Sequence, residues 1–179
     1  MSKMSNLLKY IRFDWPVHFI LLLTNWLPDN VVFLRFRGWL VRPFFGSCGK
    51  NFRVGRNVLF NNPSNISVGD NVYLAYGCWI SGRGEITFCD NVTVGPYCAV
   101  SSSNHQRIKG SYSNEEAIVD PIVIGEGCWL GAHCVVTAGC KIGKGSVLGA
   151  GAVVVHGIPD NVLAVGAPAR TIKTLEDFP

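Results

Sequence analysis

IGEGCWLGAHCVVTAGCKIGKGSVLGAGAVV, residues 124–154, repeats a six-residue pattern without interruption. Each unit opens with an aliphatic residue, glycine follows in most units, and a small residue comes four positions after the aliphatic one. The aliphatic positions are Ile124, Leu130, Val136, Ile142, Leu148 and Val154. Upstream, the same pattern runs through Val68, Leu74 and Ile80 and, after a slip of two residues, through Phe88, Val94 and Val100.

A period of six matches no helix, but it fits a short strand followed by a tight turn, with one large and one small side chain directed inward. Three such units form a triangular coil, and coils stack by parallel main-chain pairing at roughly 4.8 Å. Glycine after each aliphatic residue is expected to supply the corner conformation that a Cβ would obstruct. Since no single coil buries its apolar face, stacking must supply the core. The repeat predicts an all-β fold, a parallel β-helix over residues 51–173, between an N-terminal helical segment at 1–50 and a tail at 174–179.

Three cysteines lie six residues apart within residues 128–140, a spacing that would suit metal ligands, disulfide partners or core positions. They occupy the small inward slot of consecutive units, which lie on different faces of a coil. Because no CxxC pair accompanies them, we interpret them as buried core residues and expect no metal site. The pattern predicts a different column, in which Cys78, Cys98, Cys134 and Ala152 stack inward with free thiols.

Charge is unevenly distributed along the 179 residues: residues 1–56 carry nine Lys and Arg against two Asp, whereas the remainder carries seven against ten acidic residues. A basic, apolar N-terminus indicates either a solvated basic face or a nearby anionic surface such as a membrane. The uncharged run 15–28 is too short to span a bilayer as a helix. An odd number of cysteines, seven, fits a reducing compartment. We therefore expect a cytoplasmic protein.

The N-terminal segment should form one or two helices within residues 5–27, where Pro16 marks a kink or a helix start. Solenoid ends need a cap. The apolar side of this segment is expected either to cover the open first coil or to contact the inner face of the membrane, through residues 1–45.

Residues 104–121 leave the six-residue pattern, and long excursions from a rigid scaffold usually carry function. The excursion opens with Asn104 and His105. Imidazole is the general base best suited to neutral pH. A histidine in a loop is often only a surface residue, but its place at the root of this excursion favours a catalytic role for His105.

The aliphatic-Gly-x-x-small-x pattern and the stretch VGAPARTIK at 165–173 resemble the left-handed β-helix acyltransferases with hexapeptide repeats. Within that group the likeness is to the maltose, galactoside and polysaccharide O-acetyltransferases, and it covers about residues 50–173. The resemblance implies a left-handed helix, acetyl-CoA as co-substrate, and a homotrimer with a cleft between neighbouring subunits.

The resemblance also implies roles for individual residues. His105 would take the proton of an acceptor hydroxyl as that oxygen attacks the thioester, with backbone N–H groups stabilising the oxyanion. The implied cofactor contacts are a cleft tryptophan, two backbone positions along the pantetheine and two phosphate contacts: Trp129, Ala132, Ala150, Arg170 and Lys173. An exposed coil aromatic, for Trp129, and a closing-loop role, for Arg170 and Lys173, remain as alternatives.

The acceptor is expected to be a saccharide that contacts Asn104, Tyr76 and Gly77. Small-sugar members of the family often carry an asparagine in the coil before the histidine. Matching residues 68–80 to that stretch places Ala75 and Gly77 where asparagine would stand. This departure disfavours a maltose-like or galactoside-like acceptor and favours a polysaccharide precursor or a lipid-linked sugar.

Three other functions stay open at this point. The γ-type carbonic anhydrases share the fold and hold zinc by three histidines, but His105, His133 and His156 lie 28 and 23 residues apart, without the near pair of those enzymes. A scaffold without activity and an antibiotic O-acetyltransferase are the others. The sequence contains no nucleic-acid-binding motif, so no nucleic-acid partner is expected.

Overall fold

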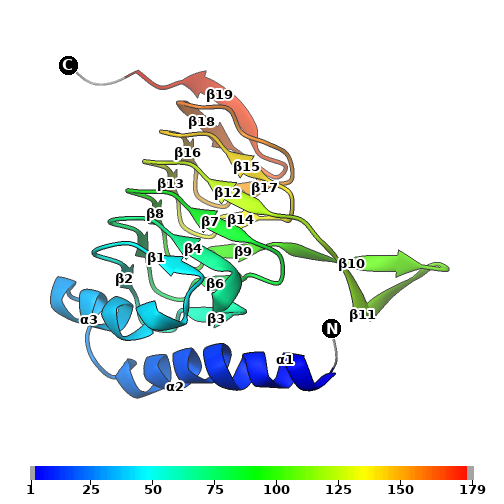
Figure 1. Cartoon of the computed structure of the whole chain (residues 1–179). Helices are drawn as coiled ribbons and strands as arrows, with labels where there is room; N and C mark the ends of the chain where they lie inside the picture. The colour runs from blue at the N-terminus through cyan, green and yellow to red at the C-terminus, as the bar shows by residue number, and fades with distance from the viewer. Residues whose placement is uncertain (1–2, 177–179) are drawn as a thin grey trace.

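The computed structural model describes residues 3–176, in which a parallel β-helix stands on an N-terminal layer of helices (Figure 1). The layer contains α1 (Lys3–Lys9), the π-helical η1 (Tyr10–Asp14), α2 (Trp15–Thr24), α3 (Val31–Val41) and the 3-10 turn η2 (Arg42–Phe44). Pro16 lies in α2 directly after the π-helical η1, and such a π turn is one way in which a continuous helix accommodates a proline. The predicted N-terminal helices are therefore confirmed.

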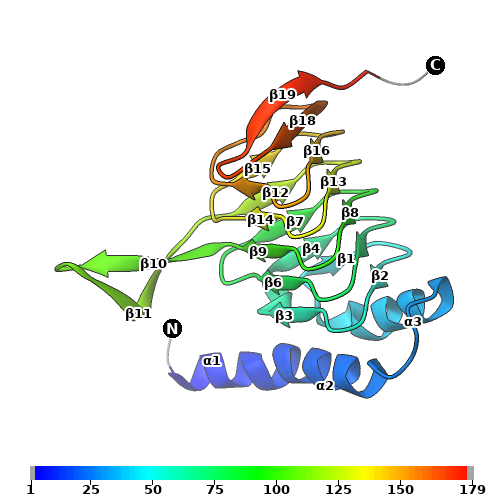
Figure 2. The ribbon, with the colours of Figure 1, turned by 180° about the vertical axis from the view of Figure 1, so that it is seen from behind.

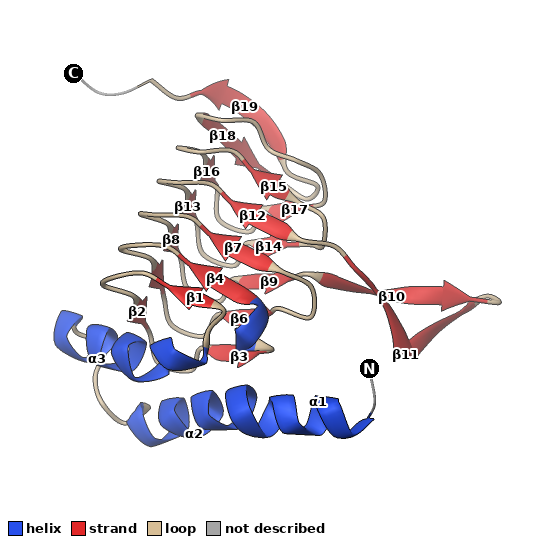
Figure 3. Ribbon diagram, viewed as in Figure 1, coloured by secondary structure: helices blue, strands red, loops and turns tan. Residues whose placement is uncertain are grey.

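The β-helix has three faces, each a sheet of short parallel strands, apart from the antiparallel β19, so that strands and turns alternate along the whole solenoid (Figure 3). Face 1 contains β1 (Ser47–Cys48), β4 (Ile66–Val68), β7 (Ile86–Phe88), β12 (Ile122–Ile124) and β15 (Lys141–Ile142). Face 2 contains β2 (Arg53–Val54), β5 (Tyr73–Leu74), β8 (Thr93–Val94), β13 (Trp129–Leu130), β16 (Val147–Leu148), β18 (Val162–Val165) and β19 (Arg170–Thr174). Face 3 contains β3 (Leu59–Asn61), β6 (Trp79–Ser81), β9 (Ala99–Ser101), β14 (Val135–Val136) and β17 (Val153–Val154).

Strand register follows the six-residue pattern. On face 2, Leu74 pairs with Val94, Val94 with Leu130 and Leu130 with Leu148, and all four side chains are buried. The slip of two residues recurs at the corner between faces 3 and 1, where the short η3 (Pro63–Asn65) sits in the first coil. The predicted β-helix fold is confirmed.

The solenoid begins earlier than the predicted boundary at residue 51, because β1 already pairs with β4 through Ser47 and Cys48. The stretch between η2 and this strand is too short to show a repeat of its own. The glycines after the aliphatic residues also differ from expectation. Gly125 lacks a positive φ, but a Cβ on it would lie 2.6 Å from the backbone nitrogen of Lys144. Close approach of the next coil, rather than a special φ, requires this glycine.

The predicted cysteine column is confirmed. Trp79, Ala99, Val135 and Val153 are successive partners on face 3, so the residues before them, Cys78, Cys98, Cys134 and Ala152, stack in one buried column. All seven cysteines are free. Hydrogen bonding to the neighbouring Cys98 and burial raise the pKa of the Cys134 thiol well above its ordinary value.

Because a thiol reagent must reach the sulfur atom, the fully buried column should be inert in the native protein. We expect a thiol reagent at pH 8 to label Cys48 and Cys89, which are half-buried, and to leave Cys78, Cys98 and Cys134 unmodified until the chain unfolds. Mass spectrometry of labelled peptides, with and without urea, measures this. Rapid native labelling of Cys134 would contradict the assigned core position.

The N-terminal layer covers the open first coil, which was one of the two predicted alternatives. Val17 and Leu21 of α2 belong to the same core cluster as Val58 and Phe60 of the first coil. Arg37 of α3 is fully buried. Its guanidinium donates to the carbonyl oxygens of Thr24, Leu27 and Val54 and forms a 2.8 Å ion pair with Asp29. This arginine ties both helices to the solenoid.

Candidate active site

The excursion is an antiparallel hairpin of β10 (Ser103–Ile108) and β11 (Ser111–Val119), which projects sideways from the corner between faces 3 and 1 (Figure 2). Its two ends are fastened at Ser102. The backbone N–H of Asp120 donates to the Ser102 carbonyl at 3.1 Å, and the Ser102 hydroxyl accepts from Gly84 N at 2.9 Å. The hydroxyl also donates to the Ser81 carbonyl at 3.1 Å. The root of the hairpin is therefore held rigidly on the coil below.

His105 lies on β10 near this root, paired with Ala117, and the neighbouring Asn104 pairs with Ile118. Both Asn104 and His105 are exposed. The register shifts between His105 and Arg107, and such irregularities often re-aim side chains beside active sites. The structure thus brings together the predicted base and one predicted acceptor contact on a well-held element.

The predicted cofactor residues gather along face 2 and its corner with face 3. Trp129 pairs with Val147, Val147 with Leu163 and Leu163 with Lys173, so Trp129 and Lys173 belong to one row that runs along the solenoid. Both side chains are exposed, and Trp129 exposes 54% of its surface.

The remaining cofactor residues border this row. Arg170 begins the edge strand β19, and its guanidinium donates to the Ala169 carbonyl at 3.1 Å. Ala132 and Ala150 occupy the corner between faces 2 and 3 in successive coils, linked by the hydrogen bond from Gly151 N to the Ala132 carbonyl. Five residues taken from a 45-residue stretch of sequence therefore flank one side of the solenoid.

Within one chain, His105 and Trp129 are not brought together. The hairpin projects on one side of the solenoid and β13 lies on the other, in both Figure 1 and Figure 2. A site that contains both the hairpin histidine and the face 2 row therefore needs residues from two copies of the chain.

Tyr76 and Gly77 lie at the corner between faces 2 and 3, away from the hairpin root and in the same corner as Ala132. The Tyr76 ring meets Tyr97 edge-on at 5.3 Å, and Tyr97 stacks on His133 at 5.1 Å. Tyr97 and His133 have φ values of 58° and 60°, a region that non-glycine residues rarely adopt. The predicted acceptor residues are thus divided between two places in one chain.

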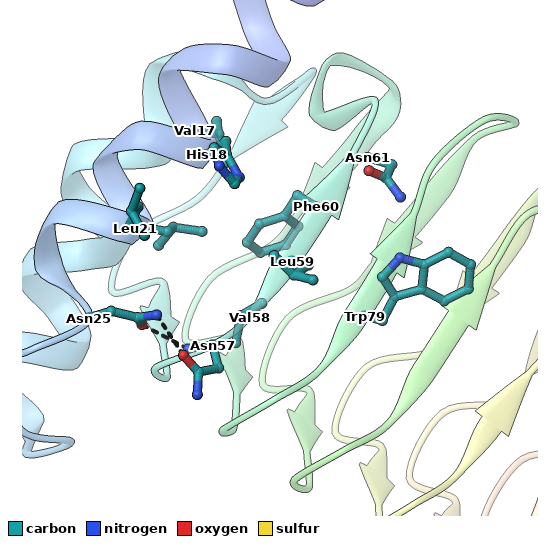
Figure 4. Close-up of a pocket in the computed structure, with 11 residues that line it drawn as sticks. Val17, His18, Leu21, Asn25, Asn57, Val58, Leu59, Phe60, Asn61 and Trp79 are labelled. Atoms are coloured by element: carbon teal, nitrogen blue, oxygen red, sulfur yellow. Dashed lines mark hydrogen bonds between the residues drawn. The ribbon is translucent and has the colours of Figure 1, made fainter.

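A pocket of about 500 Å³ between α2 and face 3 was not predicted (Figure 4). Its walls include His18 and Leu22 from α2 and Leu59, Asn61 and Trp79 from face 3. This mixture of apolar surface and a few polar groups is typical of ligand sites. Trp79 stands one coil below Ala99, on the strand column that leads into the hairpin.

The sequence did contain a signal for Trp79. It follows Cys78 in the outward slot of its unit, as Trp129 follows Cys128. A large exposed aromatic residue in that slot is unnecessary for stacking the coils, so both tryptophans were candidates for binding.

Comparison with known proteins places this geometry in a family. Residues 121–156 match the family model described as bacterial transferase hexapeptide (six repeats). The chain is 36% identical over 138 residues to galactoside O-acetyltransferase of Escherichia coli K12, which covers 77% of this chain and 68% of that protein. The chain belongs to the hexapeptide-repeat acetyltransferases. The predicted resemblance and the predicted enzyme class, an acyltransferase, are confirmed.

Other members of the family extend this likeness. The "Putative colanic acid biosynthesis acetyltransferase WcaF" of Escherichia coli K12 is 30% identical over 148 residues, covering 83% of this chain and 79% of that protein. A maltose O-acetyltransferase from Clostridium difficile 630 superposes with a TM-score of 0.83 at 31% identity, covering 95% of this chain and 89% of that one. A galactoside acetyltransferase in complex with coenzyme A gives a TM-score of 0.78 at 32% identity, covering 92% and 81%.

Proposed function

We propose that this acetyltransferase moves an acetyl group from acetyl-CoA to a hydroxyl of a saccharide, a polysaccharide or cell-surface glycan precursor, with His105 as general base. The observation that carries the proposal is the exposed Asn104–His105 pair at the fastened root of a hairpin, in a family with a coenzyme A complex among its structures.

The chemistry needs little beyond these groups. The imidazole of His105 accepts the proton of the acceptor hydroxyl while the hydroxyl oxygen attacks the thioester carbonyl. The negative charge that develops on the carbonyl oxygen is stabilised by backbone N–H groups of the cleft. The carbon–sulfur bond then breaks and coenzyme A leaves as a thiolate, which takes up a proton. No covalent intermediate on the enzyme is required.

Acetyl-CoA lies along the face 2 row in this proposal. Trp129 flanks the thioester arm, the backbones of Ala132 and Ala150 line the pantetheine, and Arg170 and Lys173 meet the phosphates. The exposed side chains of Arg170 and Lys173 support placing the phosphates at the β19 end of the row, because guanidinium and ammonium groups bind phosphate by charge-assisted hydrogen bonds.

Arg170→Ala should weaken acetyl-CoA binding about tenfold, the effect of a ~1.4 kcal/mol loss, because one phosphate contact disappears. Turnover at saturating acetyl-CoA should change less, since the guanidinium does not touch the reacting atoms. Calorimetric titration and the KM for acetyl-CoA measure the effect. Lys144→Ala is the matched control, an exposed cation at another corner of the solenoid. Equal losses in both variants would contradict a specific phosphate contact.

The assembly proposed is a homotrimer, in which the hairpin of one copy meets face 2 of the next. Cyclic symmetry then gives three equal sites from one interface. Light scattering should give about three times the 19.5 kDa mass of one chain. Mixing and exchanging inactive His105→Ala and Trp129→Ala subunits should restore partial activity, because some interfaces then carry both intact residues. An active monomer would contradict this arrangement.

The acceptor class rests on two observations. The chain is similar over most of its length to a protein named for colanic acid biosynthesis, and its pocket beside the hairpin column presents Trp79 and Asn61, a surface suited to a sugar ring. Seven free thiols favour a reducing compartment, so we place the reaction in the cytoplasm.

Thiol release from acetyl-CoA tests the function directly. A panel of sugars, sugar nucleotides, oligosaccharides and phenicol-type alcohols should give turnover with a saccharide hydroxyl. Turnover with the phenicol-type alcohols alone would replace a glycan acceptor by an antibiotic. Absence of thiol release with every acceptor, together with no acetyl-CoA binding in a thermal-shift assay, would favour a scaffold.

A further inference from the structure

The helix α2 is apolar on two opposite sides. Val17, Leu21 and Thr24 are buried against the first coil. The residues two places before Val17 and Leu21 are large, apolar and exposed: Trp15 and Phe19. Two residues correspond to about 200° of rotation around a helix, so this second stripe points away from the solenoid.

The helix α3 has the same arrangement. Its buried positions include Leu34, Gly38 and Val41. The residues two places before them are again apolar and exposed: Val32, Phe36 and Trp39. Phe36 and Trp39 stack at 6.3 Å.

Trp26, in the turn between α2 and α3, exposes 79% of its surface. We call the outward-facing set the outer apolar surface: Trp15, Phe19, Trp26, Val32, Phe36 and Trp39. The core of the solenoid does not need these residues, and soluble proteins rarely leave contiguous apolar patches of this kind in water without a binding partner.

The charges of the helical layer indicate which kind of partner would fit it. Arg12, Arg35 and Arg42 are exposed, and Arg35 and Arg42 each donate one hydrogen bond to the first coil, to Asn51 and to the Cys48 carbonyl. Among the described residues up to 45, the acidic ones are Asp14 and Asp29, and both bond into the protein. Asp14 accepts from the backbone N–H of Asn62 at 2.7 Å, and Asp29 accepts from the backbone N–H of Arg56 and pairs with the buried Arg37. The layer therefore presents apolar side chains and positive charge to the outside.

Tryptophan adds a second indication. Trp15, Trp26 and Trp39 all belong to the outer apolar surface, and all three are more than half exposed. Indole rings concentrate at the level of lipid headgroups, where the ring is buried and its N–H stays hydrated. Arginine side chains extend their cationic ends toward the same level.

We propose that the outer apolar surface docks the enzyme on an anionic phospholipid bilayer, with α2 and α3 lying flat in the interface. None of the helices in residues 3–176 has the length and apolar character needed to cross a bilayer. A second copy of the chain fits this surface less well, since a two-fold contact would press the exposed arginines of the layer against their own counterparts. The proposal does not depend on the acceptor or on His105.

Co-sedimentation with phospholipid vesicles tests the proposal on the full chain. We expect binding to vesicles of phosphatidylcholine that contain phosphatidylglycerol, weaker binding to phosphatidylcholine alone, and a loss of binding as salt is raised. Trp26→Ser combined with Trp39→Ser should lower the partition coefficient at least about tenfold, because two interfacial anchors are removed. Tyr112→Ser, which alters an exposed aromatic on the hairpin, is the matched control and should bind like the wild type.

Two further measurements make the result decisive. The double variant should keep the wild-type thermal unfolding midpoint and the wild-type rate of thiol release with a soluble acceptor, because both tryptophans lie outside the core and the site. Folded wild-type protein that stays in the supernatant with anionic vesicles would overturn the proposal. So would a double variant that binds vesicles normally, or one whose only change is a smaller assembly in light scattering, which would assign the surface to contacts between copies.

Discussion

His105→Ala is expected to lower the rate of acetyl transfer by about 10²–10⁴, the usual contribution of a general base, while acetyl-CoA binding stays near the wild-type value. In the proposed reaction His105, at the hairpin root, accepts the proton of the acceptor hydroxyl and contacts no phosphate of the cofactor. Steady-state rates of acetyl transfer and titration with acetyl-CoA measure both quantities.

His133→Ala serves as the control for this result. His133 is also exposed, but it stacks on Tyr97 at the corner between faces 2 and 3 and has no chemical role in the proposed reaction. We expect its turnover to remain near normal. If His105→Ala retained most of its activity with a good acceptor, the base would lie elsewhere, and His133 would be the next residue to test.

Arg37→Ala should lower the free energy of unfolding by about 3 kcal/mol, a value typical of removing one partner from a buried ionic network. The substitution removes the buried guanidinium on which the carbonyl oxygens of Thr24, Leu27 and Val54 and the carboxylate of Asp29 converge. Buried acceptors that lose their donor are costly. Urea unfolding measures the loss, and limited proteolysis should show cleavage in the helical layer before the solenoid.

Arg35→Ala is the matched control, because it removes the same functional group from the same helix. Arg35 is exposed and makes one hydrogen bond, from Nε to Asn51 at 2.7 Å. Its loss should cost less than about 1 kcal/mol. Similar stabilities of the two variants would show that Arg37 is not what fastens the layer to the first coil.

The solenoid was predictable because the stacking of its coils requires the same residue types at regular intervals in the sequence. Each coil must place an aliphatic residue in the same inward slot, so Leu74, Val94, Leu130 and Leu148 appear in the sequence at the positions where they meet in space. The cysteine column followed from the same register. The six-residue pattern that this stacking requires continues for more than a hundred residues.

Structural features that occur only once in the chain produce no repeating pattern from which they could be predicted. Burial of Arg37 depends on how α3 meets the first coil, and its sequence context does not distinguish it from the exposed Arg35. The predicted residue roles remain predictions, although the structure places the five proposed cofactor residues along one side of the solenoid.

The fastening of the hairpin at Ser102 has an evolutionary consequence. Asp120 returns to within hydrogen-bonding distance of Ser102, where the chain left the coil, so the seventeen intervening positions, 103–119, form a closed loop. Insertions, deletions or wholesale exchange between these two points would leave the stacking of neighbouring coils unchanged. Variation of this one segment can thus alter the proposed acceptor contacts, while face 2, the proposed acetyl-CoA surface, stays unchanged.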